Sequence, residues 1–395
     1  MLLDHLRVID IGSFVAAPAA ATAMSDFGAD VIKVEPLDGD GYRRLLAGLP
    51  DDYFWLLTGR NKRSLALDVK SESGLAVFHR LVASADVLIT NYRSDLVQKL
   101  GIDYASVRAV REDIVYAHVA GYGHEGVEAK RPAFDTTAWW GRSGMQEFTR
   151  DVEGSPIISA PGQGDHATAM SVFGAVMAAL YRRERTGAGA YVSTSLLANG
   201  VWSNGMVLQA LFGGMDWSSS KHAGESARAP LLTLYQTADD RWVQLSLLNP
   251  AKEWQPFTEA LGRPEWRTDP RYSSVEARVE NAQALQEAIA QAIGALSLDQ
   301  FRSRMDAGQV TYGYAAHNRE LIDDPQLIDN EMIVPTRDQE PDFQRTVMNP
   351  IRINDEEKRA PSRAPAIGQH TDEVLGELGF TADDVDELRS AGVVV

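Results

Sequence analysis

Near the amino terminus, two apolar β-rich runs flank a segment of small residues, and this arrangement constrains the fold more than any other part of the chain. The runs "LRVIDI" (Leu6–Ile11) and "DVIKVE" (Asp30–Glu35) predict strands. The segment "VAAPAAATAMSDF" between them predicts a helix with Pro18 in its first turn. Strands that alternate with helices favour a parallel sheet, so the sequence predicts an α/β fold.

The same pattern recurs further along the chain. "DVLITN" (Asp86–Asn91) and "DIVYAHVAGYG" each predict a strand, and the second ends in a glycine turn. An open α/β sheet binds ligands at the carboxyl ends of its strands, which fall here near residues 12–16, 91–93 and 121–123. The loop "GSFVAA" after the first strand lacks the glycine fingerprint of dinucleotide sites, and no P-loop motif is present. An ordinary NAD or ATP site is therefore disfavoured.

Composition excludes several classes of site and partner. The 395 residues include no cysteine, which excludes disulfides, thiolate zinc sites and a cysteine nucleophile. No cluster of His, Asp and Glu has metal-ligand spacing, so no metal is expected. The net charge of −17 argues against general nucleic-acid binding. If the ligand is an anion, its binding patch must be a local exception to the overall charge.

Two apolar runs are long enough to consider as membrane segments, but neither has the residue pattern of a signal peptide or a membrane-spanning helix. "MLLDHLRVIDIGSF" carries acidic and basic residues within its apolar run and is unlike a signal peptide. "SLLANGVWSNGMVLQALFGGM" contains Asn199, Asn204 and several glycines, which favours a buried or interface helix over a membrane span. We therefore expect a cytoplasmic protein with no membrane partner.

The stretch "GQGDHATAM" contains the most informative carboxylate, Asp165. The segment from His166 to Arg185 is Ala-rich and has basic residues in its last turn, so it predicts a helix. An Asp just before a helix is most often an N-cap. Alternatively, Asp165 is a covalent nucleophile: Gly162 and Gly164 leave room for a substrate, and the helix end supplies amide donors and keeps the carboxylate ionised. Both interpretations stay open at this point.

Two polar turns could hold an anionic ligand. "GRNKRSLALDV" is either a solvated cationic turn or a phosphate site with Lys62 and Arg63 as donors. "TNYRSD" is either a plain turn after a strand or a nucleotide site. In the second case Asn91 bonds an amide or base, Tyr92 stacks and Arg93 takes a phosphate.

The order and spacing of several segments together resemble a known family. These segments are "LRVIDIGSFVAAPAAATAMSDFGADVIKVEP", "NKRSLALDV", "DVLITNYRSD", "KRPAFDTTAWWGRSG", "GQGDHATAM", "RTGAGAYVSTSLL" and "APAIGQHTDEVLGELG". The chain resembles the type III CoA-transferases over nearly its whole length, the formyl-CoA transferase and carnitine CoA-transferase group with its CaiB/BaiF-like members. The resemblance implies a CoA-transferase that moves CoA from an acyl-CoA to a carboxylic acid, with no permanently bound cofactor.

The resemblance also implies roles for single residues. Asp165 matches the family's nucleophile, which forms a mixed aspartyl–acyl anhydride and then an aspartyl-CoA thioester. CoA is expected to lie along the large domain. The residues expected to contact CoA are Val15, Ala16, Lys62, Arg63, Asn91, Tyr92, Arg93 and Lys99.

The family's architecture predicts how the chain is divided. The fold is expected to combine a Rossmann-like large domain with a smaller α+β domain, in a homodimer whose two chains interlock. The predicted parts are the large CoA-binding domain over 1–200, a linker or lid over 201–228, a small domain over 229–318, and a return linker with the rest of the large domain over 319–395. A hairpin with Asp239 and Asp240 at its turn is expected to begin the small domain.

Two other functions remain as alternatives. An α-methylacyl-CoA racemase uses a second acid/base, a His, where this chain has Phe134, and Phe134 cannot carry a proton. The other alternative is a non-catalytic protein that only binds acyl-CoA. The segment "HAGESARAP" is much shorter than the glycine-rich lid of formyl-CoA transferases, which argues against formyl and oxalate specificity. Trp139 and Trp140 hint at an apolar acyl group, and Arg131 or Arg142 could pair with a second carboxylate.

Overall fold

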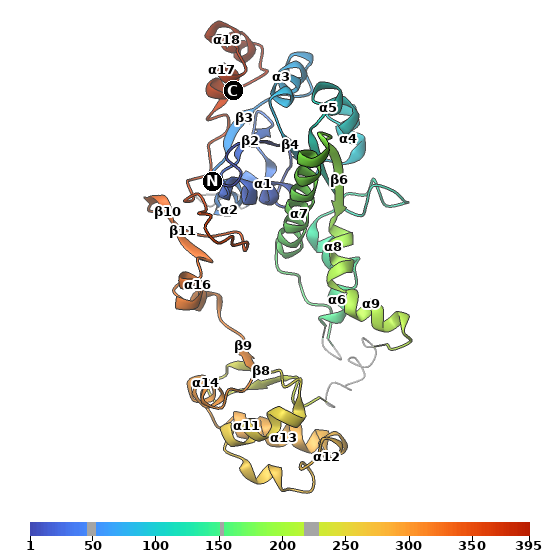
Figure 1. Ribbon diagram of the computed structural model, residues 1–395, viewed down its shortest axis with the longest axis vertical. Helices are drawn as coiled ribbons and strands as arrows, with labels where there is room; N and C mark the ends of the chain where they lie inside the picture. The colour runs from blue at the N-terminus through green and yellow to red at the C-terminus, as the bar shows by residue number, and fades with distance from the viewer. Residues whose placement is uncertain (46–52, 151–153, 217–228) are drawn as a thin grey trace. The chain divides into compact units, whose positions relative to one another are not determined.

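The computed structural model describes residues 1–45, 53–150, 154–216 and 229–395 of the chain (Figure 1). These residues form two compact units. One comprises residues 1–149, 156–206 and 325–395, and the other comprises residues 150–155 and 207–324. Part of the predicted linker, residues 217–228 with most of "HAGESARAP", lies outside the described residues.

The first unit is built on a six-stranded parallel sheet, which confirms the α/β prediction. The strand order is β3-β2-β1-β4-β5-β6, the order of a doubly wound nucleotide-binding fold. The strands are β1 (Arg7–Asp10), β2 (Asp30–Glu35), β3 (Arg63–Ala66), β4 (Val87–Thr90), β5 (Val115–Ala120) and β6 (Ala190–Ser195). The strand order reverses between the neighbouring strands β1 and β4, and such folds bind ligands at this point.

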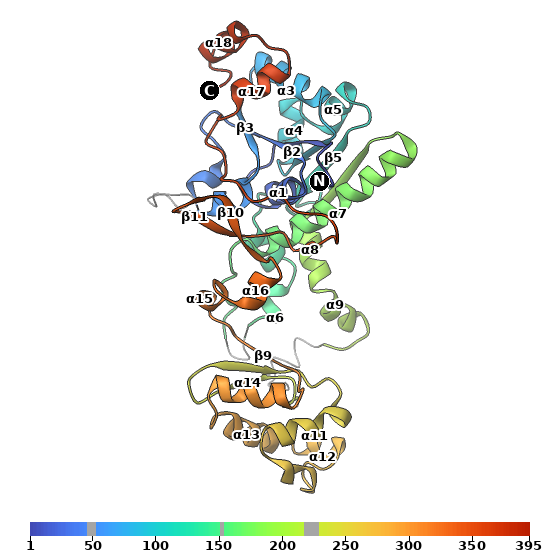
Figure 2. The same cartoon turned by 60° about the vertical axis from the view of Figure 1, so that its left-hand side comes forward.

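Helices cover both faces of this sheet, because neighbouring strand residues point to opposite sides. Val8 of β1 packs into the core formed with α1 and α7, whereas Ile9 packs into the core formed with α3, α4, α5, α17 and α18 (Figures 1 and 2). The bounds are α1 (Ala16–Asp26), α3 (Glu72–Ala83), α4 (Ser94–Leu100), α5 (Tyr104–Val110), α7 (Gln163–Thr186), α17 (Thr371–Glu377) and α18 (Ala382–Ser390).

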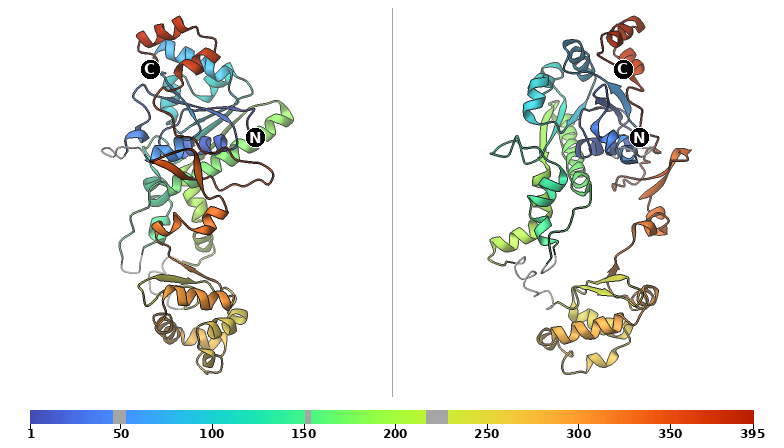
Figure 3. Two further views of the ribbon diagram at one scale, coloured as in Figure 1. Left: turned by 90° about the vertical axis from the view of Figure 1, so that its left-hand side faces the viewer. Right: turned by 180° about the vertical axis from the view of Figure 1, so that it is seen from behind.

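The carboxyl-terminal segment returns to the amino-terminal half of the chain. An isolated bridge joins Leu67 to Val394, and α17 lies beside β3 (Figure 3). Shorter elements complete this unit. They are η1 (Gly41–Arg44), α2 (Tyr53–Gly59), the π-helix η2 (Thr136–Gly141), α6 (Met145–Phe148), α8 (Leu196–Ser203), α16 (Pro325–Asp329), β10 (Ile333–Glu340) and β11 (Phe343–Val347). Helix α9 (Gly205–Phe212) runs from the first unit into the second.

The second unit has an α+β architecture. Its antiparallel sheet has the order β7-β8-β9, and the predicted hairpin with Asp239 and Asp240 at its turn is confirmed between β7 and β8. Its elements are β7 (Leu234–Gln236), β8 (Trp242–Leu245), α11 (Pro250–Ala260), η4 (Pro264–Arg267), α12 (Val275–Glu280), α13 (Ala282–Ile293), α14 (Leu298–Ala307), β9 (Tyr312–Tyr314) and α15 (Asn318–Leu321). In the part of the chain that the structure describes, no helix has the length and apolarity to cross a membrane.

Candidate functional site

Helix α7 begins three residues earlier than predicted, and this changes the role of Asp165. The N-cap position is Gly162, whose φ of 76° places it in the left-handed region that glycine adopts without strain. Asp165 therefore lies inside the first turn of the helix, and the N-cap interpretation is wrong. Gly164 packs directly on η2, since a Cβ there would lie 2.5 Å from Cγ of Trp139. This close approach fixes the first turn that carries Asp165.

A second carboxylate, Asp135, lies at the same end of α7. Its side chain is buried, and burial raises its pKa, while backbone hydrogen bonds from Thr136, Gly162 and Gly164 act in the opposite direction. Some of the free amides at the start of α7 are thus directed at Asp135. Nothing in the sequence singles out Asp135, because it lies in a separate segment from "GQGDHATAM".

Burial raises the pKa of Asp165 to about 7, and the negative charge of Asp135 adds to the effect. With a pKa of about 7, Asp165 is ionised in only about half of the molecules at neutral pH, fewer than the helix end alone would give. The helix dipole is outweighed by desolvation and by a like charge. A carboxylate with so high a pKa is a stronger nucleophile than an ordinary one, and such shifted groups concentrate at active sites.

A cavity of about 220 Å³ contains Asp165 in its wall and brings together most of the strand ends singled out from the sequence. It lies where β1, β4 and β5 end, at the carboxyl edge of the sheet where the sequence predicts a ligand site. The residues expected to contact CoA that line it are Ala16, Asn91, Tyr92 and Arg93. Ser13, Phe14, His118, Gly121, Arg131 and Phe134 also line it.

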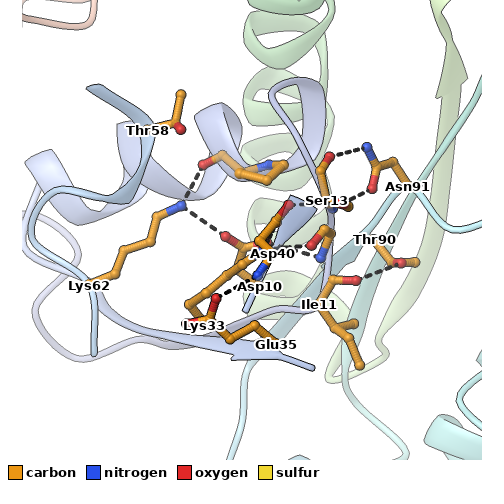
Figure 4. Close-up of polar contacts among 12 residues, drawn as sticks. Asp10, Ile11, Ser13, Lys33, Glu35, Asp40, Thr58, Lys62, Thr90 and Asn91 are labelled. Carbon is orange, nitrogen blue, oxygen red and sulfur yellow. Dashed lines mark hydrogen bonds and ion pairs between the residues drawn. The ribbon is translucent and has the colours of Figure 1, made fainter. Parts of the chain in front are cut away.

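Lys62 and Arg63 lie elsewhere and already have anionic partners. Nζ of Lys62 is fully buried, 2.8 Å from Oδ2 of Asp10, and burial lowers its pKa to about 8 (Figure 4). Arg63 lies at the amino end of β3, on the opposite edge of the sheet from the cavity. There it forms ion pairs with Asp30 at 2.6 Å and Glu377 at 2.7 Å.

The remaining two expected contacts also lie outside the cavity lining. Val15 is buried in the core at the start of α1, next to the lining residue Ala16. Lys99 is exposed in the last turn of α4. Asn91 lines the cavity, but its amide is bound to the backbone of Ser13. Oδ1 of Asn91 accepts from the amide of Ser13 at 2.8 Å, and Nδ2 donates to its carbonyl oxygen at 2.7 Å (Figure 4).

The tryptophans and histidines take positions that the sequence alone left open. Trp139 and Trp140 are buried and contact each other edge to face, so they support the start of α7 and do not line the cavity. His118 is buried in β5 and also lines the cavity. Burial lowers the pKa of His118 to about 4, and its Nε2 lies 2.6 Å from the carbonyl oxygen of Tyr92. His118 is therefore neutral at physiological pH.

The sequence was compared with those of known proteins, and residues 3–371 match the family described as CoA-transferase family III. The chain belongs to CoA-transferase family III. Membership makes it an enzyme of the CoA-transferase class and agrees with the resemblance found in the sequence.

Individual relatives cover the whole chain. It is 28% identical over 400 residues to (R)-2-hydroxy-4-methylpentanoate CoA-transferase of Clostridioides difficile, with 100% of both chains covered. It is also 28% identical to formyl-CoA:oxalate CoA-transferase of Streptomyces coelicolor, with 99% of both covered. Among solved structures, a CaiB/BaiF family protein from Brucella suis superimposes with a TM-score of 0.81 at 25% identity, covering 95% of this chain and 98% of that one. The fold is thus shared over nearly the full length.

Proposed function

We propose that this enzyme transfers CoA between two carboxylic acids through covalent intermediates on Asp165. The observation that carries the proposal is a half-buried carboxylate of raised pKa, fixed in the first turn of α7 and facing a cavity at the carboxyl edge of the sheet. A carboxylate is a competent covalent nucleophile, and the covalent route divides one difficult exchange into easier steps. One thioester replaces another, so the exchange needs no ATP.

The steps balance without a co-reactant. The Asp165 carboxylate attacks the thioester carbonyl carbon, the C–S bond breaks, and CoA leaves as the thiolate. The thiolate then attacks the Asp165 carbonyl of the mixed anhydride, which forms an aspartyl-CoA thioester and releases the first acid. The carboxylate of the second acid attacks that thioester, CoA leaves again, and the thiolate takes the new acyl group from the anhydride. The Asp165 carboxylate is regenerated.

CoA itself binds here as a substrate. A second cavity of about 460 Å³ lies at the carboxyl ends of β1, β2 and β3, and Tyr92 lines both cavities. We infer that CoA spans the two, with its thioester next to Asp165. Ala16, Tyr92 and Arg93 line the cavity with Asp165, which supports their assignment as CoA contacts, while Asn91 holds the neighbouring loop.

We also propose that the protein is a homodimer whose chains interlock, as in the proteins that it resembles. Large apolar side chains on α8 and α9 support an interface, since Trp202 is 86% and Met206 75% exposed in the single chain. Light scattering in solution is expected to give twice the mass of one chain, and a monomeric mass would contradict the proposal.

Incubation with acyl-CoA tests the covalent mechanism. We expect a peptide containing Asp165 to gain the mass of CoA less one water, because the aspartyl-CoA thioester accumulates when no acceptor acid is present. Borohydride treatment should reduce that thioester and mark the same residue. Transfer activity with no adduct on Asp165 would overturn the assignment.

The alternatives predict different outcomes. A racemase exchanges the α-proton of a bound acyl-CoA with solvent when no acceptor acid is present. The family racemase position, Phe134, lines the cavity without a titratable group, and His118 has its pKa lowered to about 4. We therefore expect no deuterium uptake at the α-carbon. A protein that only binds acyl-CoA would show affinity without turnover over a broad panel of acids.

The carboxylate pair predicts a specific pH dependence. The kcat/KM for acyl-CoA should rise through a pKa near 7, because only ionised Asp165 attacks. In Asp135→Asn the neighbouring negative charge is absent, so ionisation of Asp165 becomes easier and the acid limb moves down by about one pH unit. The shift is partial because burial remains. Asp383→Asn, on the exposed side of α18, is the control and should leave the profile unchanged.

A further inference from the structure

Two phenylalanines from distant parts of the sequence form one wall of the cavity that contains Asp165. The rings of Phe14 and Phe134 lie edge to face with their centroids 5.5 Å apart, and both residues line the cavity. Phe134 is 56% exposed although it contacts another aromatic ring. A large apolar side chain left open inside a functional cavity is a surface for an apolar group of a ligand.

The backbone at Phe14 is held in a conformation that a phenylalanine rarely adopts. Its φ is +61°, in the left-handed region, which costs free energy for a residue with a Cβ. Hydrogen bonds on both sides maintain it. Asn91 binds the backbone of Ser13 twice, and Oδ1 of Asp40 accepts from Oγ of Ser13 at 2.9 Å and from the amide of Phe14 at 3.3 Å (Figure 4).

A cluster of four buried charges lies beneath this loop. Nζ of Lys33 is 2.9 Å from Oδ2 of Asp40 and 3.7 Å from Asp10, and Asp10 also pairs with Lys62 (Figure 4). Lys33 donates a further hydrogen bond to the carbonyl oxygen of Gly12, two residues before Phe14. Burying four charges costs desolvation free energy, and apolar side chains of similar size would stabilise this edge of the sheet at least as well. The contacts of the cluster with Gly12, Ser13 and Phe14 instead fix where the Phe14 ring lies.

The cations beside the aromatic wall already have carboxylate partners. Arg93 pairs with Asp95 at 2.9 Å, and Arg131 pairs with Glu128 at 2.6 Å. Arg142, which also pairs with Glu128, does not line the cavity. A second carboxylate on a substrate would compete with Asp95 or Glu128 for these cations, whereas an alkyl or phenyl group meets the two rings directly.

We propose that Phe14 and Phe134 are specificity-determining residues that select carboxylic acids ending in a branched alkyl or phenyl group over dicarboxylic acids. This inference rests on the proposed CoA transfer at Asp165, and it names the class of carboxylic acid that the enzyme accepts. The aromatic wall favours apolar acyl groups by contact and edge-to-face packing. The buried charge cluster positions one of its two rings.

A competition assay tests the selection. With 3-phenylpropanoate and succinate together as acceptors, we expect wild-type enzyme to favour 3-phenylpropanoate, and Phe134→Ala to lower the ratio of the two kcat/KM values by about tenfold or more. Because the ratio is measured in one tube, partial loss of folded enzyme cancels. Phe134→Leu should keep more of the preference. Val127→Ala, at a fully exposed side chain outside the cavity lining, should leave the ratio unchanged.

Binding of unreactive CoA thioethers separates this inference from the proposed function. A thioether ending in phenyl should bind more tightly to wild-type protein than one ending in carboxylate, and Phe134→Ala should remove the difference. The proposed selectivity would be wrong, even if CoA transfer is found, if wild-type protein bound the two thioethers equally or bound the carboxylate more tightly. It would also be wrong if the ratio of the two affinities stayed unchanged in Phe134→Ala. If no acid accepts CoA, the proposed function fails, and the thioether titrations still decide whether the wall selects apolar groups.

Discussion

Asp165→Asn is expected to reduce CoA transfer by at least about 10⁴-fold, the size of loss seen when a nucleophile or its activating partner is removed. Asparagine keeps the volume of the side chain, but its amide neither attacks a thioester nor forms an anhydride. The variant should also fail to gain the mass of CoA on the peptide around position 165. Rates with and without acceptor acid, measured by chromatography of the CoA esters, check both expectations.

The same substitution should make the folded protein more stable above neutral pH. The pKa of Asp165 rises from its ordinary value of 3.8 to about 7 on folding, so the folded state binds this proton more tightly than the unfolded state does. Stability contributed by the bound proton is fully present below pH 4 and is lost as the pH rises through 7. The asparagine side chain stays neutral at every pH, so the melting temperature of the variant should exceed that of wild type at pH 8 and approach it near pH 4.

These two readouts together separate chemistry from folding. An inactive variant that melts higher at pH 8 has lost the nucleophile and kept its structure. Active-site groups often lower the stability of the folded protein, so their removal raises the melting temperature while it abolishes activity. Substantial turnover in Asp165→Asn, or a lower melting temperature at pH 8, would contradict the assignment. Asp383→Asn, a carboxylate exposed on α18, should change neither activity nor melting temperature.

The large-scale arrangement of the chain could be predicted because it follows from local patterns. The apolar runs around Val8 and Ile32 predict strands that are buried on both faces, and a parallel sheet covered by helices buries both faces. The site at the carboxyl edge follows from the parallel order of the strands. Asp165 could be singled out for the same reason, because it lies next to an Ala-rich segment that clearly predicts a helix.

The roles of individual charges could not be predicted, because their partners are distant in the sequence. Lys62 meets Asp10, which is 52 residues away, and Arg63 meets Glu377, which is 314 residues away. One local signal was present and was missed. Asp10 and Lys33 are charged residues within otherwise apolar strands, a pattern that indicates a buried ion pair. Asp135 gave no such signal, since only the fold brings it to the start of α7.

Lys33→Met is expected to destabilise the protein by about 3–5 kcal/mol, the cost of breaking a buried ion pair on one side. Methionine matches the length of lysine without its charge, so Asp10 and Asp40 are left with Lys62 as their only cation in the cluster of Figure 4. The melting temperature should fall by roughly 5 °C. Lys70→Met, at an exposed lysine, is the control and should leave it nearly unchanged.

A double variant tests whether the buried charge cluster positions the loop at Phe14. Lys33→Met combined with Asp40→Asn removes one charge of each sign, so it should be more stable than Lys33→Met alone. If the cluster serves to hold the loop at Phe14, the double variant regains stability but still loses selectivity for apolar acids, because methionine at position 33 no longer donates to the carbonyl oxygen of Gly12. If selectivity returned together with stability, the charges would be structural only. A loss below about 1 kcal/mol in Lys33→Met, typical of an exposed pair, would contradict the burial of the cluster itself.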